Sequence, residues 1–409
     1  MKKFNYIDLF SGCGGLTEGF EVDGRYNILA AVEWEKRPMQ TLEKRLEIRW
    51  ENKKAKEICI NFDIQRTNEL LYGWKNDKAY GDGKGLKHLT KSKKVDLIIG
   101  GPPCQAYSIA GRIRDRDGMQ NDYRNYLFES YIKIVNEYKP QVFIFENVPG
   151  ILSAKPGGVK IVDEIRDQFK KNGYVIIENL KEAIINVADY GIPQNRRRII
   201  IMGIRQDDRE YSDIQNMLKD FYSDILLKYT KEKMTVYDAI GDMQKFYPLY
   251  NTEKKKNLSH TIYDVNLKDH LPRFHNDRDI GIFKKLAYDK FCGEKKYNST
   301  DKKKELYTLL TGKKSNIHKY HVIDWSLPST TIVSHLHKDG LRYIHPDHEQ
   351  ARSITIREAA RLQSFEDDFE FLGSQGDKYK MIGNAVPPKF ANILAKAIIE
   401  LFNKYFIQK

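Results

Sequence analysis

The first 205 residues alternate short apolar runs with segments of helical periodicity, and this alternation most constrains the fold. Residues 126–138 and 162–171 place apolar side chains at helical spacing. The apolar runs rich in Val, Ile and Phe are predicted strands: 6–10, 28–32, 95–99, 142–145, 175–177 and 199–204. Short strands without a polar face, separated by helices, predict an α/β fold with a doubly wound, mostly parallel sheet. In such sheets a ligand sits beyond the carboxyl ends of the strands.

The pattern changes twice farther along the chain. Strand signals become scarce after residue 205, and nine of the ten histidines lie after residue 259. Order returns where Thr355 and Glu358 form a capping box, and residues 390–402 read as an amphipathic helix. We therefore expect an α/β domain over 1–205, a second, smaller and irregular domain over 206–345, and a segment over 346–409 that returns to the first domain and completes it.

The charge of the chain favours a polyanionic partner. There are 69 Lys and Arg against 56 Asp and Glu, a formal net charge of +13, and such cations release condensed counterions when they neutralise phosphates. A lysine-rich surface can also be merely solvated, so charge alone leaves nucleic acid as one of two interpretations. The four cysteines lack paired spacing, and the His335/His337 and His345/His348 pairs lack further ligands, so no metal site is expected.

A glycine-rich turn follows the first predicted strand. Residues 8–16 read Asp-Leu-Phe-Ser-Gly-Cys-Gly-Gly-Leu, and glycines let the backbone turn sharply and approach a ligand ahead of a helix. The spacing matches neither a phosphate loop nor the G-x-G-x-x-G dinucleotide pattern. Glu33 ends the second predicted strand, where a carboxylate can accept hydrogen bonds from a ribose diol. These residues indicate an adenosine-containing ligand, with an ordinary tight turn as the alternative.

Later strand ends carry reactive side chains. Cys104 follows two prolines after the third predicted strand, and Glu146 ends the next one. Arg196 and Arg198 come just before the last strand. A thiol held by a stiff backbone suits a nucleophile, and a carboxyl group with a guanidinium supplies an acid and a clamp for a carbonyl. Each residue alone could be structural, but together they predict a catalytic site at one edge of the sheet.

In order and spacing, these motifs resemble those of the C5-cytosine DNA methyltransferases of bacterial restriction–modification systems. The resemblance covers about 1–205 and 350–409 and implies the Rossmann-like fold of S-adenosylmethionine-dependent methyltransferases. In this family the unmatched middle region, 206–345, is the target-recognition domain. The matching segments are the glycine turn at 8–15, Pro-Pro-Cys at 102–104, Glu-Asn-Val at 146–148, Gln-x-Arg-x-Arg at 194–198, an arginine-rich helix at 352–363 and Gly-Asn-Ala-Val-Pro-Pro at 383–388.

The resemblance implies a site-specific DNA (cytosine-5-)-methyltransferase that acts on a cytosine flipped out of the duplex. Cys104 would add to carbon 6 of the base, so that carbon 5 can accept the methyl group of S-adenosyl-L-methionine. Glu146 would protonate N3 and Arg198 would hold O2, with Arg196 bracing the site. The implied cofactor residues are Phe10, Gly12, Gly14, Gly15, Leu16, Glu33, Trp34, Asp63, Ile64, Pro102, Leu127, Asn384, Ala385 and Val386. Gln105, Ser108, Gly111 and Arg112 belong to the loop expected to close over the base and contact DNA.

Two other functions stay open at this point: a tRNA cytosine-5 methyltransferase, as in one branch of the family, and a catalytically silent DNA-binding regulator. Tyr107-Ser108 and the long middle region argue against the first, and the intact Cys104 argues against the second. The protein is expected to be cytoplasmic, since no apolar run could span a membrane. It is also expected to be monomeric. Its expected partners are double-stranded DNA and a cognate restriction endonuclease. The basic segment 66–94 has no assigned role beyond contact with the DNA backbone.

Overall fold

The computed structural model describes residues 3–91, 93–103, 127–155, 160–249, 258–262, 267–314 and 319–407. The chain divides into two compact units. The first comprises Met1–Tyr190, Arg197–Lys231 and Ala385–Lys409, and the second comprises Gly191–Arg196 and Glu232–Asn384. The second unit thus includes a short earlier segment, 191–196, and its main part, 232–384, begins and ends later along the chain than the predicted 206–345 segment.

The later start has a local cause. Helix α9 (Tyr211–Asp220) buries Ile214 and Leu218, and the side chain of Gln215 donates a hydrogen bond to the carbonyl oxygen of Ile176 in the sheet (2.8 Å). Residues just after 205 therefore pack on the first unit.

The first unit is built around an eight-stranded sheet. Five neighbouring strands run parallel, in the order β3 (Cys59–Asn61), β2 (Tyr26–Glu33), β1 (Phe4–Leu9), β6 (Leu97–Gly100) and β7 (Val142–Asn147). The long strand β11 (Arg197–Arg205) runs antiparallel to β7, β8 (Tyr174–Ile176) and β9 (Ile184–Asn186). The prediction of an α/β fold with a mostly parallel sheet is confirmed, and the interior of these strands is fully buried, as expected for a sheet covered on both faces.

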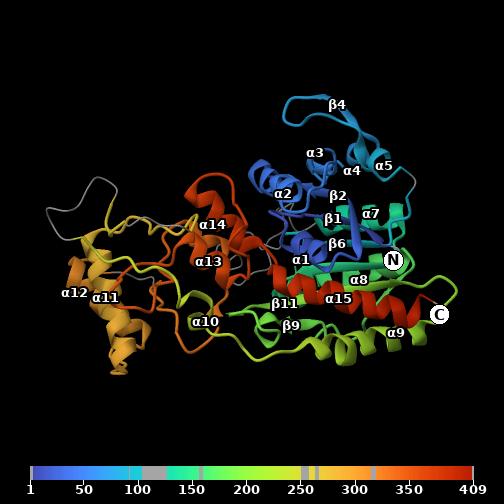
Figure 1. The fold of residues 1–409 in the computed structure, drawn as a ribbon. Helices are drawn as coiled ribbons and strands as arrows, with labels where there is room; N and C mark the ends of the chain where they lie inside the picture. The colour runs from blue at the N-terminus through green and yellow to red at the C-terminus, as the bar shows by residue number, and fades with distance from the viewer. Residues whose placement is uncertain are drawn as a thin grey trace. The chain divides into compact units, whose positions relative to one another are not determined.

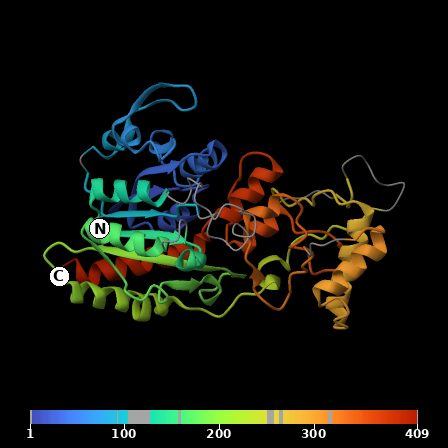
Figure 2. The same cartoon turned by 180° about the vertical axis from the view of Figure 1, so that it is seen from behind.

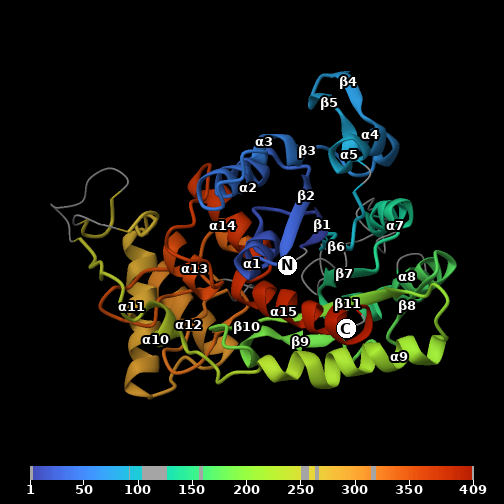
Figure 3. The same ribbon diagram turned by 45° about the vertical axis from the view of Figure 1, so that its right-hand side comes forward.

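Helices cover both faces of this sheet. Figure 1 and Figure 3 show α1 (Gly15–Asp23) and α15 (Pro388–Tyr405) on one side, with α7 (Leu127–Tyr138) and α8 (Ile161–Lys171) on the other. The remaining helices and short strands of this unit are α2 (Lys36–Ile48), α3 (Ala55–Ile58), α4 (Thr67–Tyr72), β4 (Trp74–Asp77), β5 (Gly81–Gly83) and α5 (Gly85–Thr90).

Helix α15 packs against elements from the first 33 residues of the sequence. It begins at Pro388, a residue suited to the first helical position, and buries one apolar face along its length. It packs against α1, where a side chain at Gly19 would overlap the backbone of α15, and the carbonyl oxygen of Ala395 accepts a hydrogen bond from the hydroxyl of Tyr26 in β2 (2.7 Å). The predicted 390–402 helix therefore exists and lies in the first unit, whereas residues 346–384 lie in the second.

The second unit is largely irregular between short elements. Its apolar centre lies between α11 (Asp277–Cys292) and α12 (Thr300–Thr311), where Phe283, Leu286 and Leu306 are buried; Figure 2 shows these two helices side by side. Its other elements are β10 (Gln194–Asn195), α10 (Val236–Ile240), β12 (Ser329–Thr330), α13 (Ile356–Leu362) and α14 (Gln375–Asn384).

The predicted capping box is present at the start of α13, where the Thr355 hydroxyl accepts the Glu358 backbone N–H and the Glu358 carboxylate accepts that of Thr355. The helix is shorter than the predicted 352–363, because Arg352 lies before the cap. Its fully buried guanidinium pairs with both oxygens of Glu358 (2.6 and 2.7 Å). The arginine-rich stretch thus forms a buried ion pair rather than an extra helical turn.

Candidate active site

Parallel strands place the predicted site residues of the first unit at one edge of the sheet. Glu33, Gly100 and Asn147 are the last residues of β2, β6 and β7. Because these strands run in the same direction, their ends and the loops that follow meet at the carboxyl edge.

The glycine turn at this edge is held by the last predicted motif. Phe10 and Gly12 both have positive φ (59° and 57°), which turns the chain sharply between β1 and α1. A Cβ at Gly15 would overlap the carbonyl oxygen of Val386, so only glycine lets these two segments pack. Ala385 lies beside them, and Leu16 and Val386 are buried. The two motifs, more than 360 residues apart in sequence, are therefore in direct contact.

Glu33 braces the turn from the next strand. Its carboxylate accepts hydrogen bonds from the backbone N–H groups of Gly12 (3.0 Å) and Glu35 (2.8 Å). Burial raises the pKa of Glu33 to about 7, although these two hydrogen bonds favour the charged form. The structure thus brings Glu33 next to the glycine turn, as predicted from the sequence.

The sequence analysis included Asp8 in the glycine-turn motif but gave its side chain no role. Asp8 is fully buried under the turn, and one carboxylate oxygen accepts a hydrogen bond from the Thr17 hydroxyl in α1 (2.6 Å). Its other oxygen has no hydrogen-bond partner in the described part of the chain. Burial raises the pKa of Asp8 to about 7, with the Thr17 hydrogen bond acting in the opposite direction. A buried acid inside an otherwise apolar strand was the signal that could have identified it.

The predicted adenine-side residues lie around the ends of β2 and β3. Trp34 is 51% exposed directly after β2, and Asp63 follows β3 and accepts the backbone N–H of Gln65 (3.0 Å). The side chain of Asn61 donates to the carbonyl oxygens of Glu33 (2.9 Å) and Trp34 (2.8 Å), a brace that the sequence did not suggest. Ile64 and Leu127 are buried, and Asn384 is exposed in the second unit.

The predicted acid and clamp form an ion pair. Nε of Arg198 lies 2.9 Å from Oε1 of Glu146, and both side chains are mostly buried. The antiparallel pairing of β11 with β7 explains this contact, because it puts the first residues of β11 beside the last residues of β7. The other carboxylate oxygen faces Gly101, where a Cβ would lie only 2.7 Å from it. Glu146 is therefore fixed in position from two sides.

The segment leading to the predicted nucleophile is tied to the same strand. The side chain of Asn147 donates a hydrogen bond to the carbonyl oxygen of Pro102 (3.2 Å), two residues before Cys104. Cys104 itself lies outside the described residues, as do Gln105, Ser108, Gly111 and Arg112. This stretch of the described chain ends at Pro103, so the structure describes Glu146, Arg198 and the backbone up to one residue before Cys104.

Comparisons with known proteins agree with this arrangement. The family model of the C-5 cytosine-specific DNA methylases matches residues 4–400. The chain belongs to this family. It is therefore an enzyme, a DNA cytosine-5 methyltransferase, as the motifs indicated.

Individual relatives align over nearly the whole chain. The type II methyltransferase M.Bpa9945I of Bacillus paralicheniformis is 32% identical over 97% of this chain and 99% of its own. M.FnuDI of Fusobacterium nucleatum is 33% identical over 98% and 96%. Among solved structures, a putative DNA modification methyltransferase from an E. coli prophage has a TM-score of 0.63 at 23% identity, covering 98% of this chain and all of its own, which shows the same fold.

In this methyltransferase, Arg196 does not share the surroundings of Arg198. Arg196 belongs to the second unit, where its fully buried guanidinium donates to the carbonyl oxygens of Ile332 (2.9 Å) and Gly383 (3.3 Å). Gln194 is buried beside it and accepts the backbone N–H of Ile332 (2.9 Å). These contacts favour a role for Arg196 in holding the backbone of the second unit together, whereas the sequence suggested a place in the catalytic centre.

Cys13 does not resemble a second nucleophile. It is buried inside the glycine turn, and burial raises the pKa of its thiol to about 12.

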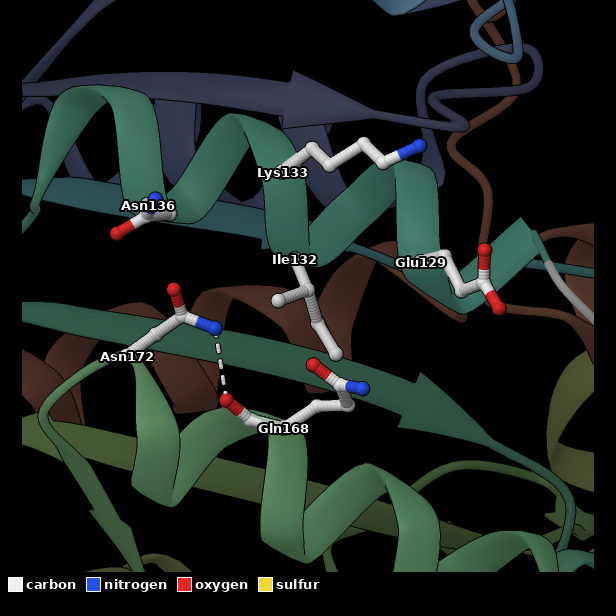
Figure 4. A pocket seen from close by; sticks show the side chains of 6 residues that line it. All are labelled: Glu129, Ile132, Lys133, Asn136, Gln168 and Asn172. Carbon is white, nitrogen blue, oxygen red and sulfur yellow. Dashed lines mark hydrogen bonds between the residues drawn. The ribbon is translucent and has the colours of Figure 1, made fainter.

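The methyltransferase also has a cavity of about 350 Å³ between α7 and α8, lined by Glu129, Ile132, Lys133, Asn136, Gln168 and Asn172 (Figure 4). This cavity contains none of the predicted site residues. Among the described helices, none is both long and apolar enough to cross a membrane.

Proposed function

We propose that this methyltransferase modifies one specific sequence in double-stranded DNA, with S-adenosyl-L-methionine as methyl donor, and protects that DNA in a restriction–modification system. The named relatives are type II methyltransferases, which supports this assignment over a tRNA methyltransferase or a silent regulator. The observation that carries the catalytic part is the ion pair of Glu146 and Arg198 beside the Pro102 backbone. We propose further that the enzyme acts as a monomer in the cytoplasm, alongside a cognate endonuclease.

The residues of the first unit fit an adenosine-type donor. A Cβ at Gly12 would meet no atom within 4 Å, so this side of the turn is open, whereas Gly14 and Gly15 pack against Leu42 and Val386. The Glu33 carboxylate lies beside the open side and can accept hydrogen bonds from ribose hydroxyls. S-adenosyl-L-methionine supplies an electrophilic methyl group on a sulfonium. The backbone of the glycine turn and the side chains of Glu33 and the exposed Trp34 would hold this donor.

The catalytic roles follow from chemistry at the carboxyl edge. Carbon 5 of cytosine is a weak nucleophile. Addition of the Cys104 thiolate to carbon 6 would raise the electron density at carbon 5. Negative charge then develops toward N3 and O2 of the base. Glu146 would donate a proton to N3, and the guanidinium of Arg198 would donate hydrogen bonds to O2. After methylation the proton on carbon 5 passes to water, the Cys104 sulfur leaves carbon 6 as a thiolate, and N3 returns its proton to Glu146, which restores the aromatic ring.

Trapping with a modified base tests this proposal. Duplex DNA with 5-fluorocytosine at the target position should form a stable covalent adduct, because fluorine cannot leave as a cation. The adduct should be absent with Cys104→Ala. The target site is first mapped by bisulfite sequencing of the genome of a host that expresses the enzyme. The duplex for trapping is then designed around that site. Labelled methyl transfer into tRNA but not into any DNA would overturn the proposal.

Donor binding is expected to weaken as the pH falls through 7. The pKa of Glu33 is raised to about 7, so the carboxylate that accepts the ribose hydroxyls is fully present only above that pH. Calorimetric affinity for S-adenosyl-L-methionine should fall up to about tenfold between about pH 8 and about pH 6. Glu33→Gln should bind roughly 10- to 100-fold more weakly at pH 8.

Asp8 is the control for the Glu33 prediction, since its pKa is also raised to about 7 beneath the same turn. Asp8→Asn should keep most of the pH dependence, whereas Glu33→Gln should flatten it. A Glu33→Gln variant that is folded by circular dichroism and still shows the full pH dependence would contradict this role.

A further inference from the structure

A lysine-bearing hairpin of the first unit is not used by the proposed chemistry. It consists of β4 and β5 with the flanking Lys84, residues 74–84, and we call it the lysine hairpin. Trp74 pairs with Gly83 and Asp77 with Gly81. Figure 1 and Figure 3 show it standing away from the central sheet, next to α4 and α5. None of the predicted donor or catalytic residues lies on it.

The base of the lysine hairpin is packed at the carboxyl edge of the sheet. Phe62 comes directly after Asn61, the last residue of β3. The ring of Trp74 stacks on that of Phe62 with centroids 3.9 Å apart, and the ring of Tyr80 lies 5.0 Å from it. A Cβ at Gly83 would overlap the Trp74 ring, so the second strand passes directly against the indole. The hairpin is therefore anchored at the same edge as the catalytic side chains.

Arg66 fixes the hairpin and neutralises Asp77, one of its two acidic residues. Its guanidinium lies over the Phe62 ring (4.7 Å), pairs with Asp77 in the hairpin (2.6 Å) and also pairs with Glu69. The remaining acid, Asp82, accepts the backbone N–H of Asn76 (2.6 Å). One arginine thus occupies two of the three carboxylates between residues 66 and 94.

The lysines of the hairpin have no such partners. Lys75, Lys78 and Lys84 are exposed, and none of them pairs with a carboxylate in the described part of the chain. Residues 66–94 contain eight Lys and Arg against three Asp and Glu. This excess leaves a positive surface on a rigid support, and the natural substrate of this enzyme family is a polyanion.

We propose that Lys75, Lys78 and Lys84 bind the phosphate backbone of the DNA duplex that flanks the target site. This contact is separate from the second unit, and it rests on the proposed action on double-stranded DNA. It carries no sequence information, since lysine contacts to phosphates position the protein and increase affinity without reading bases. Through the hairpin, the first unit would bind the duplex by contacts of its own.

The strand order sets the distance from the target base. The hairpin base lies at β3 and Glu146 ends β7, four strand spacings away. At about 4.8 Å per spacing this is roughly 19 Å. For a duplex that runs across the strands, with a rise of about 3.4 Å per base pair, the hairpin base lies about six base pairs from the flipped cytosine. Duplexes with shorter flanks should not reach the hairpin.

Salt dependence of DNA binding tests the proposal. The variant Lys75→Gln/Lys78→Gln/Lys84→Gln is compared with the unmodified enzyme on duplexes that carry the mapped site with flanks of about 4 or about 14 base pairs. Each lost phosphate contact lowers the slope of log affinity against log salt by about 0.9. On the long duplex, the advantage of the unmodified enzyme should therefore shrink about 40-fold between about 50 and about 200 mM salt. On the short duplex, the two slopes should agree.

Matched controls separate this contact from general charge. Lys139, Lys170 and Lys171 are exposed in the same unit near the opposite, amino edge of the sheet, next to the starts of β7 and β8. Their replacement by Gln should leave the slope on both duplexes unchanged. Lys→Arg at the three hairpin positions should retain the full slope, because it keeps the positive charges, and circular dichroism of the Gln variant should match that of the unmodified enzyme.

Equal slopes for the unmodified enzyme and the hairpin variant on the long duplex would overturn the proposal. An equal loss in the amino-edge control would do the same, because it would show that only total charge matters. Neither result depends on catalysis. Failure of the proposed function would instead appear as absent methyl transfer by the unmodified enzyme.

Discussion

Replacement of Glu146 by glutamine is expected to slow methyl transfer by roughly a hundredfold to ten-thousandfold, the usual contribution of a positioned general acid. The amide is close in shape to the carboxyl group and can still accept a hydrogen bond from Arg198, which lies 2.9 Å away. It cannot supply a proton to N3 of the base. Single-turnover incorporation of labelled methyl groups into the mapped site measures the effect without interference from product release.

The ion pair gives this prediction an internal check. Because Glu146 and Arg198 are in direct contact, the double variant Glu146→Gln/Arg198→Ala should lose less activity than the product of the two single losses. Glu164→Gln is a suitable control, since this residue lies in the first turn of α8 on the outside of the sheet. A Glu146→Gln enzyme with undiminished single-turnover rates would exclude Glu146 as the acid.

Arg352→Met is expected to lower the free energy of unfolding of the second unit by about 3–5 kcal/mol, because it leaves a buried carboxylate without its counter-charge. Arg352 is fully buried and donates to both carboxylate oxygens of Glu358. The double variant Arg352→Met/Glu358→Gln should recover part of the loss. Urea unfolding followed by circular dichroism measures the change.

An exposed pair provides the comparison for Arg352. Arg278 lies 2.9 Å from Asp279 but is 44% exposed, so Arg278→Met should cost no more than about 1 kcal/mol. An equal decrease in the free energy of unfolding for the two variants would show that burial does not make the Arg352–Glu358 ion pair more stabilising.

The same network is expected to make the second unit sensitive to acid. Burial disfavours the charged form of Glu358, but the charge and hydrogen bonds of Arg352 dominate and hold its pKa well below the usual range. Burial lowers the pKa of His345 to about 3, with Arg352 adding to the effect. In both cases the unfolded chain binds protons that the folded chain does not, so stability falls as the pH drops below about 6.5 and further below about 4.3.

Most of the sheet could be predicted from the sequence, because buried strands and helices leave strong local patterns. The direction of β11 could not, since an apolar run reads the same whether the strand is parallel or antiparallel. That direction determines the site: it is the reason that Arg198 meets Glu146. The sequence predicted that both residues lie at one edge of the sheet, but the cause of their contact is a tertiary feature.

Arg196 shows the limit of reasoning from short motifs. The two arginines are separated by one residue, and alternate residues of an extended strand would share a face. The chain passes from the second unit to the first between Arg196 and Arg197. Arg196 therefore holds backbone carbonyls while Arg198 reaches Glu146. The unit boundary depends on packing across distant segments, such as Gln194 against Leu362, and no local pattern encodes it.

The contact between Gly15 and Val386 has a consequence for synthesis of the enzyme in the cell. The glycine turn is synthesised more than 360 residues before the segment that packs behind it. A chain that stops before residue 386 thus lacks the segment that packs against Gly15. Methylation should therefore begin only after residue 386 has been translated and has packed against the turn, and fragments cut before residue 386 should stay inactive even if they hold Glu146 and Arg198.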